Sequence, residues 1–409
     1  ALSNTMIKNN QGIGAILNNG DYTLTDMEIS GNSGLSLKAA NGALILANVD
    51  ITGNGGGIAA DRTDINLNGV RIINNANESG SAISVDNAGK IVITDAQISN
   101  NRGGGIDTVD DITLKADGHH IKITGNLSET DKAGINLMVK QTGPSGKRSI
   151  NINTGNDAGG IIEIAGNRMN VSDVDDPDSG TALGIFIGSD GVATNDVDLN
   201  IDGKGTFELK DGMRVAFVNN AGDANVPVFT LNKTDEGAFN WGGDNQVISQ
   251  NASYINLKGG KTSLADGFTL TGHTGDVRKL FTNVTNDATL NLEGSATFDY
   301  GLLSMAGSSA LNLKDYATLV LGEKMELAFK DSAGIALGEG AGVHITGNAT
   351  ITDGSINFGA QQYLSVDSSK KLTLDAQTYG LFTFNNSLLN IGVSTHAVSG
   401  ALMEYGQII

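Results

Sequence analysis

A short phrase that recurs about every 22 residues organises the first third of the chain. The phrase is an apolar residue, two small or polar residues and then Asn, and successive Asn residues lie 22, 22, 21, 26 and 25 positions apart. A Gly-rich step and short segments of alternating apolar residues follow it. A fixed period of this length is typical of a solenoid, whose repeats bury their apolar faces only by stacking. The six copies are Ile7–Asn10, Ile29–Asn32, Ile51–Asn54, Ile72–Asn75, Ile98–Asn101 and Ile123–Asn126.

Each repeat has room for three short strands and three turns. Alternating Ile, Leu and Val residues predict inward positions, and Gly and Asn suit the turns because they tolerate a left-handed backbone. We therefore predict an all-β fold, a right-handed parallel β-helix of roughly 17–18 coils with three short strands per coil. The recurring asparagines are expected to form an internal ladder in which side-chain amides bond from coil to coil. They are Asn10, Asn32, Asn54, Asn75, Asn101 and Asn126.

The period changes along the chain without a break in composition. Residues 1–126 predict regular coils, 127–245 predict coils with polar insertions, and 246–409 predict regular coils in a second register, as in Leu290–Gly294. Because no Pro- or Ser-rich linker interrupts the pattern, we predict one β-helix domain over 1–409. Insertions in a solenoid protrude from one face, which is often the binding face.

Charge and composition exclude several classes of protein. The net charge of −19 argues against binding of nucleic acid or of an anionic membrane, since both would be repelled. The absence of cysteine excludes disulfides and thiol chemistry. No apolar run reaches the length of a membrane span, and Ala1–Asn4 carry no signal segment. We therefore expect either a cytoplasmic protein or a processed, exported fragment.

Asn- and Gly-rich coils such as Ile51–Ile58, together with Gly347–Gly354, resemble the passenger domains of bacterial autotransporter adhesins. The resemblance rests on repeat style and covers nearly the whole chain. It implies a non-enzymatic adhesin on the bacterial surface that binds host extracellular-matrix protein such as fibronectin, glycosaminoglycans, or copies of itself. It also implies export through the periplasm and attachment to the outer membrane only through a translocator barrel, which is absent from this sequence.

Parallel β-helices also carry pectin-type lyases and hydrolases, which need clustered carboxylates in fixed geometry. Asp110–Asp111 and Asp175–Asp176 are the candidate pairs, but the Gly-Asp-Asp, His-Gly and Arg-Ile-Lys segments of polygalacturonases are missing. Asp111 precedes an alternating segment, so this pair marks the entry to a strand. No catalytic residue is predicted, although carboxylates from distant coils could still cluster.

Cofactor and metal signals are absent. The acidic loop around Asp176 could hold Ca²⁺, but it lacks the spacing of known calcium loops, and a solvated loop is the simpler interpretation. His119 and His120 are adjacent, so on a strand they point to opposite faces and do not chelate one metal. We predict no cofactor and no metal.

Basic residues against the acidic background are the predicted ligand-binding residues. Arg and Lys give sulfate and carboxylate groups charge-assisted hydrogen bonds, and stacked coils would present them at intervals of about 4.8 Å. The predicted glycan-binding residues are Lys140, Lys147, Arg148, Lys204, Lys210 and Arg214. The residues predicted to meet a protein partner are Asp173, Asp175, Asp176 and Asp178.

Two alternatives to a host-binding adhesin stay open. Copies of the chain could associate through their Asn, Thr and Asp faces, as in an autoaggregating protein. A polysaccharide lyase, hydrolase or tailspike-like endoglycosidase is the other alternative, and the single Trp241 argues mildly against it because sugar-cleaving grooves usually stack sugars on aromatic rings.

Overall fold

The structure is a computed structural model. It describes the chain except for residues 77–79, 131, 133, 140–145, 173–179, 190–195, 220–227, 249–251, 273–279, 392–393, 404 and 409. The chain forms two compact units, Ala1–Pro227 and Val228–Ile409. Both consist of stacked parallel strands, and the described residues contain no helix. That the two units continue a single domain, as the sequence predicts, stays a prediction.

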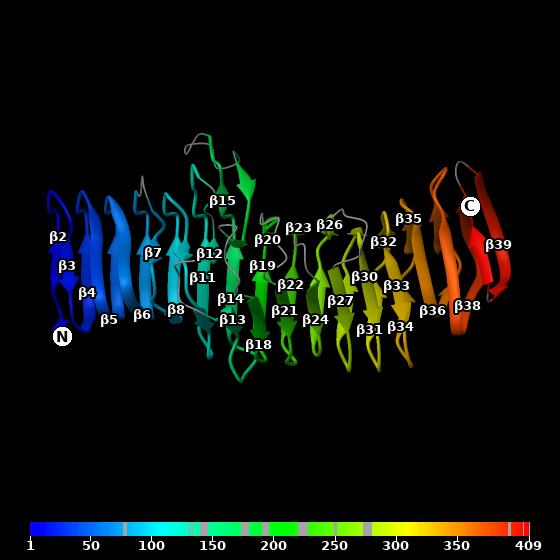
Figure 1. Ribbon diagram of the computed structural model, residues 1–409, viewed down its shortest axis with the longest axis horizontal. Coiled ribbons are helices and arrows are strands. Elements are labelled where there is room, and N and C mark those ends of the chain that lie inside the picture. Colours follow the sequence, from blue (N-terminus) through cyan, green and yellow to red (C-terminus); the bar gives the residue numbers. More distant parts are fainter. Residues whose placement is uncertain are drawn as a thin grey trace. The chain divides into compact units, whose positions relative to one another are not determined.

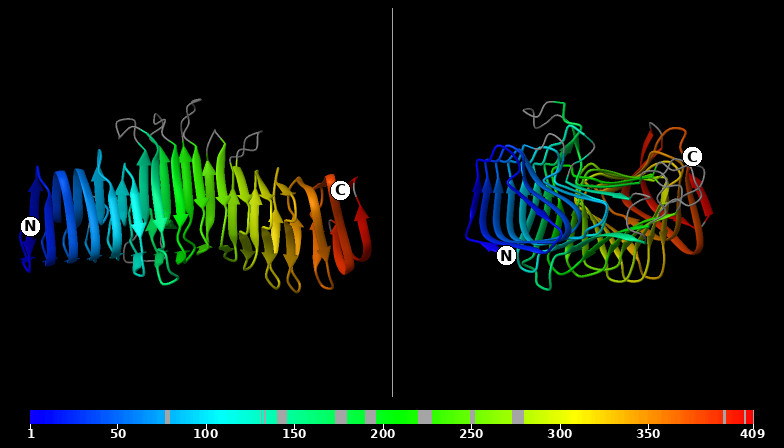
Figure 2. Two further views of the ribbon diagram at one scale, coloured as in Figure 1. Left: turned by 90° about the horizontal axis from the view of Figure 1, so that it is seen from below. Right: turned by 60° about the vertical axis from the view of Figure 1, so that its left-hand side comes forward.

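Unit 1 (Ala1–Pro227) is a stack of coils (Figure 1), and its strand pairings define three strand positions per coil. In the N-terminal coils the strands run around the corners without interruption, and later coils have separate short strands (Figure 2). β15 (Arg168–Met169) and β16 (Thr181–Ala182) form an antiparallel pair outside the stack. The stacked strands are β1 (Leu2–Ser3), β2 (Met6–Lys8), β3 (Ala15–Asn18), β4 (Tyr22–Ser30), β5 (Leu35–Thr52), β6 (Gly56–Ile73), β7 (Ile83–Asp86), β8 (Ile91–Ser99), β9 (Ile106–Thr108), β10 (Ile112–Lys115), β11 (His120–Thr124), β12 (Ile135–Val139), β13 (Arg148–Asn153), β14 (Ile161–Ala165), β17 (Ile185–Ser189), β18 (Val197–Asp202), β19 (Thr206–Leu209) and β20 (Val215–Asn219).

Unit 2 (Val228–Ile409) repeats this arrangement and ends differently. Its last two strands, β39 (Ser394–Met403) and β40 (Tyr405–Ile408), pair antiparallel with the long strand β38 (Leu372–Ile391). The preceding strands stack in parallel. They are β21 (Phe229–Lys233), β22 (Ala238–Trp241), β23 (Asp244–Ile248), β24 (Ser253–Leu257), β25 (Lys261–Leu264), β26 (Phe268–Thr271), β27 (Leu280–Val284), β28 (Thr289–Leu292), β29 (Ala296–Asp299), β30 (Gly301–Met305), β31 (Ala310–Leu313), β32 (Thr318–Leu321), β33 (Glu326–Phe329), β34 (Gly334–Leu337), β35 (Gly342–Ile345), β36 (Ala349–Phe358) and β37 (Tyr363–Val366).

The predicted fold class is confirmed: the chain is a right-handed parallel β-helix. The predicted 17–18 coils are too many, because the two units together make about 14 turns. The reason lies in the insertions, which lengthen the middle coils of unit 1. Asp111 bonds to Ser149, 38 residues on, and Asn151 bonds to Asn200, 49 residues on, although each pair is only one coil apart.

The core of each unit is a set of inward columns. In unit 1 one column has zero exposure throughout, because every residue in it is a branched aliphatic that meets its counterpart in the next coil. It consists of Leu44, Ile65, Ile91, Ile112, Ile150 and Leu199. In unit 2 the core also holds aromatic rings, and Trp241 packs against Phe239 and Phe268 with ring centroids 5.2 Å apart in both pairs. Trp241 is therefore buried and belongs to the core.

Candidate functional site

The six predicted ladder asparagines of unit 1 lie one above another. Each side-chain Nδ2 donates to the Oδ1 of the next asparagine at 2.7–3.0 Å, and that same Oδ1 accepts the backbone N–H of the previous one. Five of the six are buried, and Asn10, in the first coil, is exposed. The ladder thus satisfies buried polar groups at one corner of the coils that it links.

The ladder has a seventh member that sequence analysis missed. Asn126 donates to the Oδ1 of Asn167 at 2.9 Å, across the 41 residues of an insertion-bearing coil. The signal was present, since Ile164–Asn167 matches the recurring phrase. The insertion concealed it by breaking the spacing of about 22 residues.

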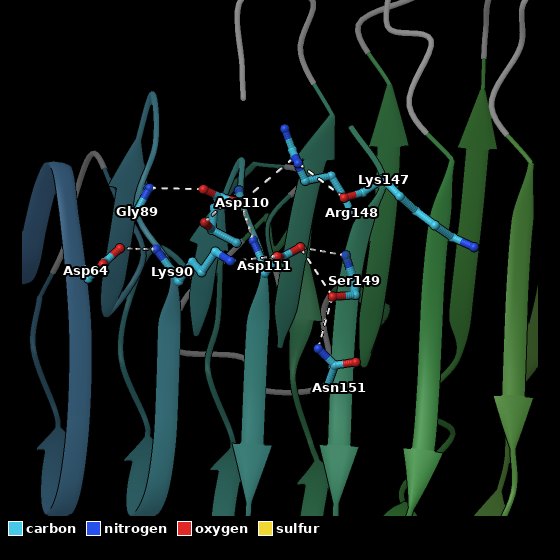
Figure 3. Close-up of polar contacts among 10 residues, drawn as sticks. Asp64, Gly89, Lys90, Asp110, Asp111, Lys147, Arg148, Ser149 and Asn151 are labelled. Atoms are coloured by element: carbon cyan, nitrogen blue, oxygen red, sulfur yellow. Dashed lines mark hydrogen bonds and ion pairs between the residues drawn. The ribbon is translucent and has the colours of Figure 1, made fainter. Parts of the chain in front are cut away.

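A buried ion pair occupies another corner of unit 1 (Figure 3). Arg148 begins β13 in register with Val197 of β18, which has zero exposure, so Arg148 faces inward and is only 4% exposed. Its Nε lies 3.9 Å from Oδ1 of Asp110, and its Nη1 donates to the carbonyl of Lys147 at 3.2 Å. Its Nη2 is buried without a hydrogen-bond partner. Arg148 is therefore not the surface ligand residue that the sequence suggested, because the alternation of β13 turns it into the interior.

The two adjacent carboxylates, Asp110 and Asp111, bind the backbone of neighbouring coils. Asp110 accepts the N–H of Gly89 at 3.3 Å and that of Asp111 at 2.8 Å, and Asp111 accepts the N–H of Ser149 at 2.9 Å. Lys90 lies 3.6 Å from the other oxygen of Asp111. Figure 3 shows these groups joining successive coils at the entry to their strands, as the sequence predicted for this pair. These contacts hold neighbouring coils together, which is a structural role.

Two of the exposed lysines predicted to bind a glycan form ion pairs with carboxylates. Lys147 lies 2.7 Å from Asp198, and Lys210 lies 2.7 Å from Glu208 and 3.6 Å from Glu163. The hydrogen bond with Glu208 raises the pKa of Lys210 above its ordinary value. Lys147 precedes β13 whereas Lys204 follows β18, so they lie at opposite ends of two paired parallel strands. Hence these lysines do not form one continuous basic patch.

The other predicted site residues divide into two groups. Arg214 precedes β20 and is half-buried, with its Nε buried and without a hydrogen-bond partner. Lys140 and the acidic residues Asp173, Asp175, Asp176 and Asp178 lie outside the described residues. The predicted glycan and protein-partner sites therefore stay predictions.

The adjacent histidines have different partners. His119 lies 3.7 Å from Asp95, and His120 lies 3.2 Å from Glu163. In the described part of the chain, no three His, Asp or Glu residues are placed to hold a metal ion together.

Outward-facing columns are the feature that sequence analysis undervalued. Parallel register places residues of the same kind above one another, so β13 and β18 align Asn151 with Asn200, whose amides bond at 2.9 Å. Unit 2 has an outward ladder as well, in which Asn283 donates to Asn256 and Asn256 donates to Asn232, both at 3.0 Å. The second repeat register contained this signal, because Leu199–Asp202 and Ile255–Leu257 both alternate apolar residues with Asn.

Comparison with known proteins agrees with the fold. A family model described as "Right handed beta helix region" matches residues 1–127, which are the regular coils at the start of unit 1. None of the curated proteins compared with the chain matches it. Over the described residues, no helix is long and apolar enough to cross a membrane.

Proposed function

We propose that this β-helix is a non-enzymatic adhesin of the bacterial cell surface. Its partners are a host extracellular-matrix protein such as fibronectin, a sulfated glycosaminoglycan, or both. It reaches the surface after export through the periplasm and is held there by a translocator barrel. The resemblance of the repeats to autotransporter passenger domains supports this assignment.

The observation that carries the proposal is the repetition of short polar side chains along outward columns. Ser149 lies above Asp198, and Asn151 above Asn200, at the spacing of stacked strands, about 4.8 Å. An extended polymer or polypeptide can meet such a column at several successive coils, so that many weak contacts add up. The candidate catalytic pair Asp110–Asp111, in contrast, is bound to backbone N–H groups and to cations.

In this proposal the exposed lysines of unit 1 bind the sulfate groups of the glycan. Lys147, Lys204 and Lys210 are exposed, and a sulfate group can compete for ammonium groups whose carboxylate partners are at the surface. Arg148 is not grouped with these three lysines because it is buried. Binding through these lysines should weaken as salt rises, since each is screened.

The test measures retention of the purified chain on immobilised fibronectin, heparin and chondroitin sulfate at low and high salt. The size of each glycan is measured afterwards. We expect retention on at least one surface without shortening of the glycan. Shortened chains would replace the adhesin with a lyase or hydrolase, and absence of retention on all three surfaces would contradict host binding.

A triple variant separates the two kinds of partner. Lys147→Ala, Lys204→Ala and Lys210→Ala together should lower heparin retention at low salt by about tenfold and leave fibronectin retention unchanged. The matched control replaces three exposed lysines elsewhere, Lys38, Lys314 and Lys330, and so removes the same charge. Equal losses in both triple variants would show that net charge, and not these three lysines in particular, governs the binding.

A further inference from the structure

Unit 2 carries an uncharged outward stripe of two adjacent columns over four coils. Both columns come from β21, β24, β27 and β30, which follow one another along unit 2 (Figure 1). One column is Thr230, Tyr254, Phe281 and Leu302, and the other is Asn232, Asn256, Asn283 and Ser304. We call these eight residues the aromatic–amide stripe. Every one of them is half-buried or exposed, because the inward positions between them fill the core.

The apolar column contains a pair of stacked rings at the surface. The centroids of Tyr254 and Phe281 lie 5.5 Å apart with an interplanar angle of 21°, and Tyr254 is 38% exposed. Leu302 continues the column in register with Phe281. Aromatic rings that are held by stacking lose little conformational freedom when a ligand packs on them, so they make a pre-organised apolar platform.

The amide column has both donors and acceptors. Asn256 donates one Nδ2 hydrogen to Asn232 and accepts one from Asn283, both at 3.0 Å. These bonds fix the orientation of the Asn256 amide. They use one of its two hydrogens and one of the two lone pairs of its oxygen. A hydroxyl group is likewise donor and acceptor at once, so a row of amides matches a row of hydroxyls.

We propose that the aromatic–amide stripe binds an uncharged polysaccharide. A sugar ring has an apolar C–H face and hydroxyl groups at its rim, and the two columns place an apolar strip beside a hydrogen-bonding strip. The C–H face can pack on the apolar column of Tyr254, Phe281 and Leu302 by van der Waals contact and by removal of apolar surface from water. The absence of charge in the eight residues favours a neutral chain over a sulfated one, so this site is separate from the lysines of unit 1.

The size of the stripe favours a glycan over a second copy of the protein. Columns on one strand face are about 7 Å apart and coils are about 4.8 Å apart, so the stripe covers on the order of 200–300 Å². A stable protein interface needs about 800 Å² from each partner. The stripe is too small for that but long enough for a few sugar rings that run along the stacking direction.

The test is affinity electrophoresis of the intact chain in native gels that contain hydroxyethyl cellulose, galactomannan or dextran, with dextran sulfate for comparison. We expect at least one neutral polymer to retard the chain, with no effect of salt. Tyr254→Ala and Phe281→Ala should each weaken this retardation by about tenfold, because each removes one ring from the apolar column. Tyr254→Phe keeps the ring and should keep the binding.

The control is Tyr316→Ala, which removes another tyrosine of unit 2 that is 71% exposed and lies off the stripe. It should bind like the unaltered chain, and circular dichroism should show the same β content for every variant. If Phe281→Ala fails to fold, Asn283→Asp tests the stripe by adding one charge, which should also weaken binding. Lack of retardation by all three neutral polymers, or an equal loss in Tyr316→Ala, would overturn the proposal. So would a concentration-dependent dimer that Tyr254→Ala abolishes, because the stripe would then bind a second copy.

Discussion

At the scale of single residues, the ladder explains why the recurring phrase ends in Gly-Asn or Asn-Asn. The residue before each ladder asparagine has positive φ, for example 56° at Asn9, 65° at Gly31 and 55° at Asn100. Gly adopts this left-handed backbone at little cost, and Asn does so more readily than most other residues. The turn directs the next amide inward, where it bonds to its counterparts in the adjacent coils. One dipeptide therefore specifies both the corner and its buried hydrogen bonds.

Asn75→Ala should destabilise unit 1 by about 2–4 kcal/mol, because the side chain is 1% exposed and its loss leaves buried carbonyls and an amide without partners. Urea unfolding followed by circular dichroism measures the change. The matched control is Asn151→Ala, which also breaks an Asn–Asn bond but on the outward face, and should cost less than about 1 kcal/mol. Similar losses in the two variants would contradict a special role for the buried ladder.

The Asp110–Arg148 pair gives a second prediction at this scale. Arg148→Met should lower the free energy of unfolding by about 2–4 kcal/mol, because it leaves the Asp110 carboxylate without its buried cation. The double variant Asp110→Asn, Arg148→Met should lower the free energy of unfolding by less than the sum of the decreases in the two single variants.

Lys147→Met is the control for that prediction. It removes an exposed cation next to Arg148, and its unfolding free energy should change by less than about 1 kcal/mol. The placement of Arg148 in the interior would be wrong if Arg148→Met were neutral and Lys147→Met costly.

At the scale of elements, the turns are held by carboxylates from the neighbouring coil. Asp299 accepts the backbone N–H of Glu323 at 2.7 Å, and Asp315 accepts that of Glu339 at 2.9 Å. Glu323 in turn accepts from the side-chain amide of Asn348 at 2.9 Å. Each of these bonds links one coil to the next, so the turns as well as the strands are hydrogen-bonded from coil to coil. This use of acidic residues accounts for part of the strongly negative charge.

Glu323 supplies a prediction about pH. The hydrogen bond from Asn348, helped by Lys370, holds the pKa of Glu323 below its ordinary value of 4.5. Because the folded pKa lies below the unfolded pKa, its contribution to stability is present above pH 4.5 and is lost as the pH falls through the folded pKa. We expect Glu323→Gln to have a lower Tm than the unaltered chain at neutral pH. That difference should shrink as the pH falls from neutral to below 4.5.

Glu339→Gln, an exposed carboxylate elsewhere in unit 2, serves as the control. Its Tm difference from the unaltered chain should change less over this interval. Scanning calorimetry measures both variants. The prediction would be wrong if the Tm difference between the Glu323→Gln variant and the unaltered chain became larger in acid. Glu323 would then not be stabilised as an anion.

At the scale of the whole molecule, attraction between neighbouring charges competes with repulsion among all of them. The ion pairs are mostly at the surface, such as Lys8–Glu28 and Lys132–Asp107, and such pairs contribute little each. The net charge of −19 means that the excess carboxylates of the chain repel one another. We therefore expect repulsion to outweigh the surface pairs.

Raising NaCl from about 20 mM to about 500 mM should accordingly raise the Tm of the chain, because screening weakens the repulsion. Scanning calorimetry at neutral pH measures this. A sucrose series at matched osmolality controls for general solvent effects. A Tm that falls with NaCl would show that the ion pairs dominate.

The fold class could be predicted from the sequence, because a recurring Gly-Asn or Asn-Asn turn and alternating aliphatic residues allow little except stacked coils. The sequence also predicted the ladder from Asn10 to Asn126, since all its members share one local phrase. It overestimated the number of coils because insertions of unknown length look like additional repeats.

Tertiary structure alone decided which side chains face solvent and which meet one another. Arg148 and Lys147 are neighbours in sequence, yet strand alternation buries the first and exposes the second. Tyr254 and Phe281 are 27 residues apart, and only parallel register stacks their rings into one surface. The physical reason is that a side chain in a β-helix meets its partner in the next coil. The number of residues between the two partners changes with each insertion, so it cannot be read from the sequence.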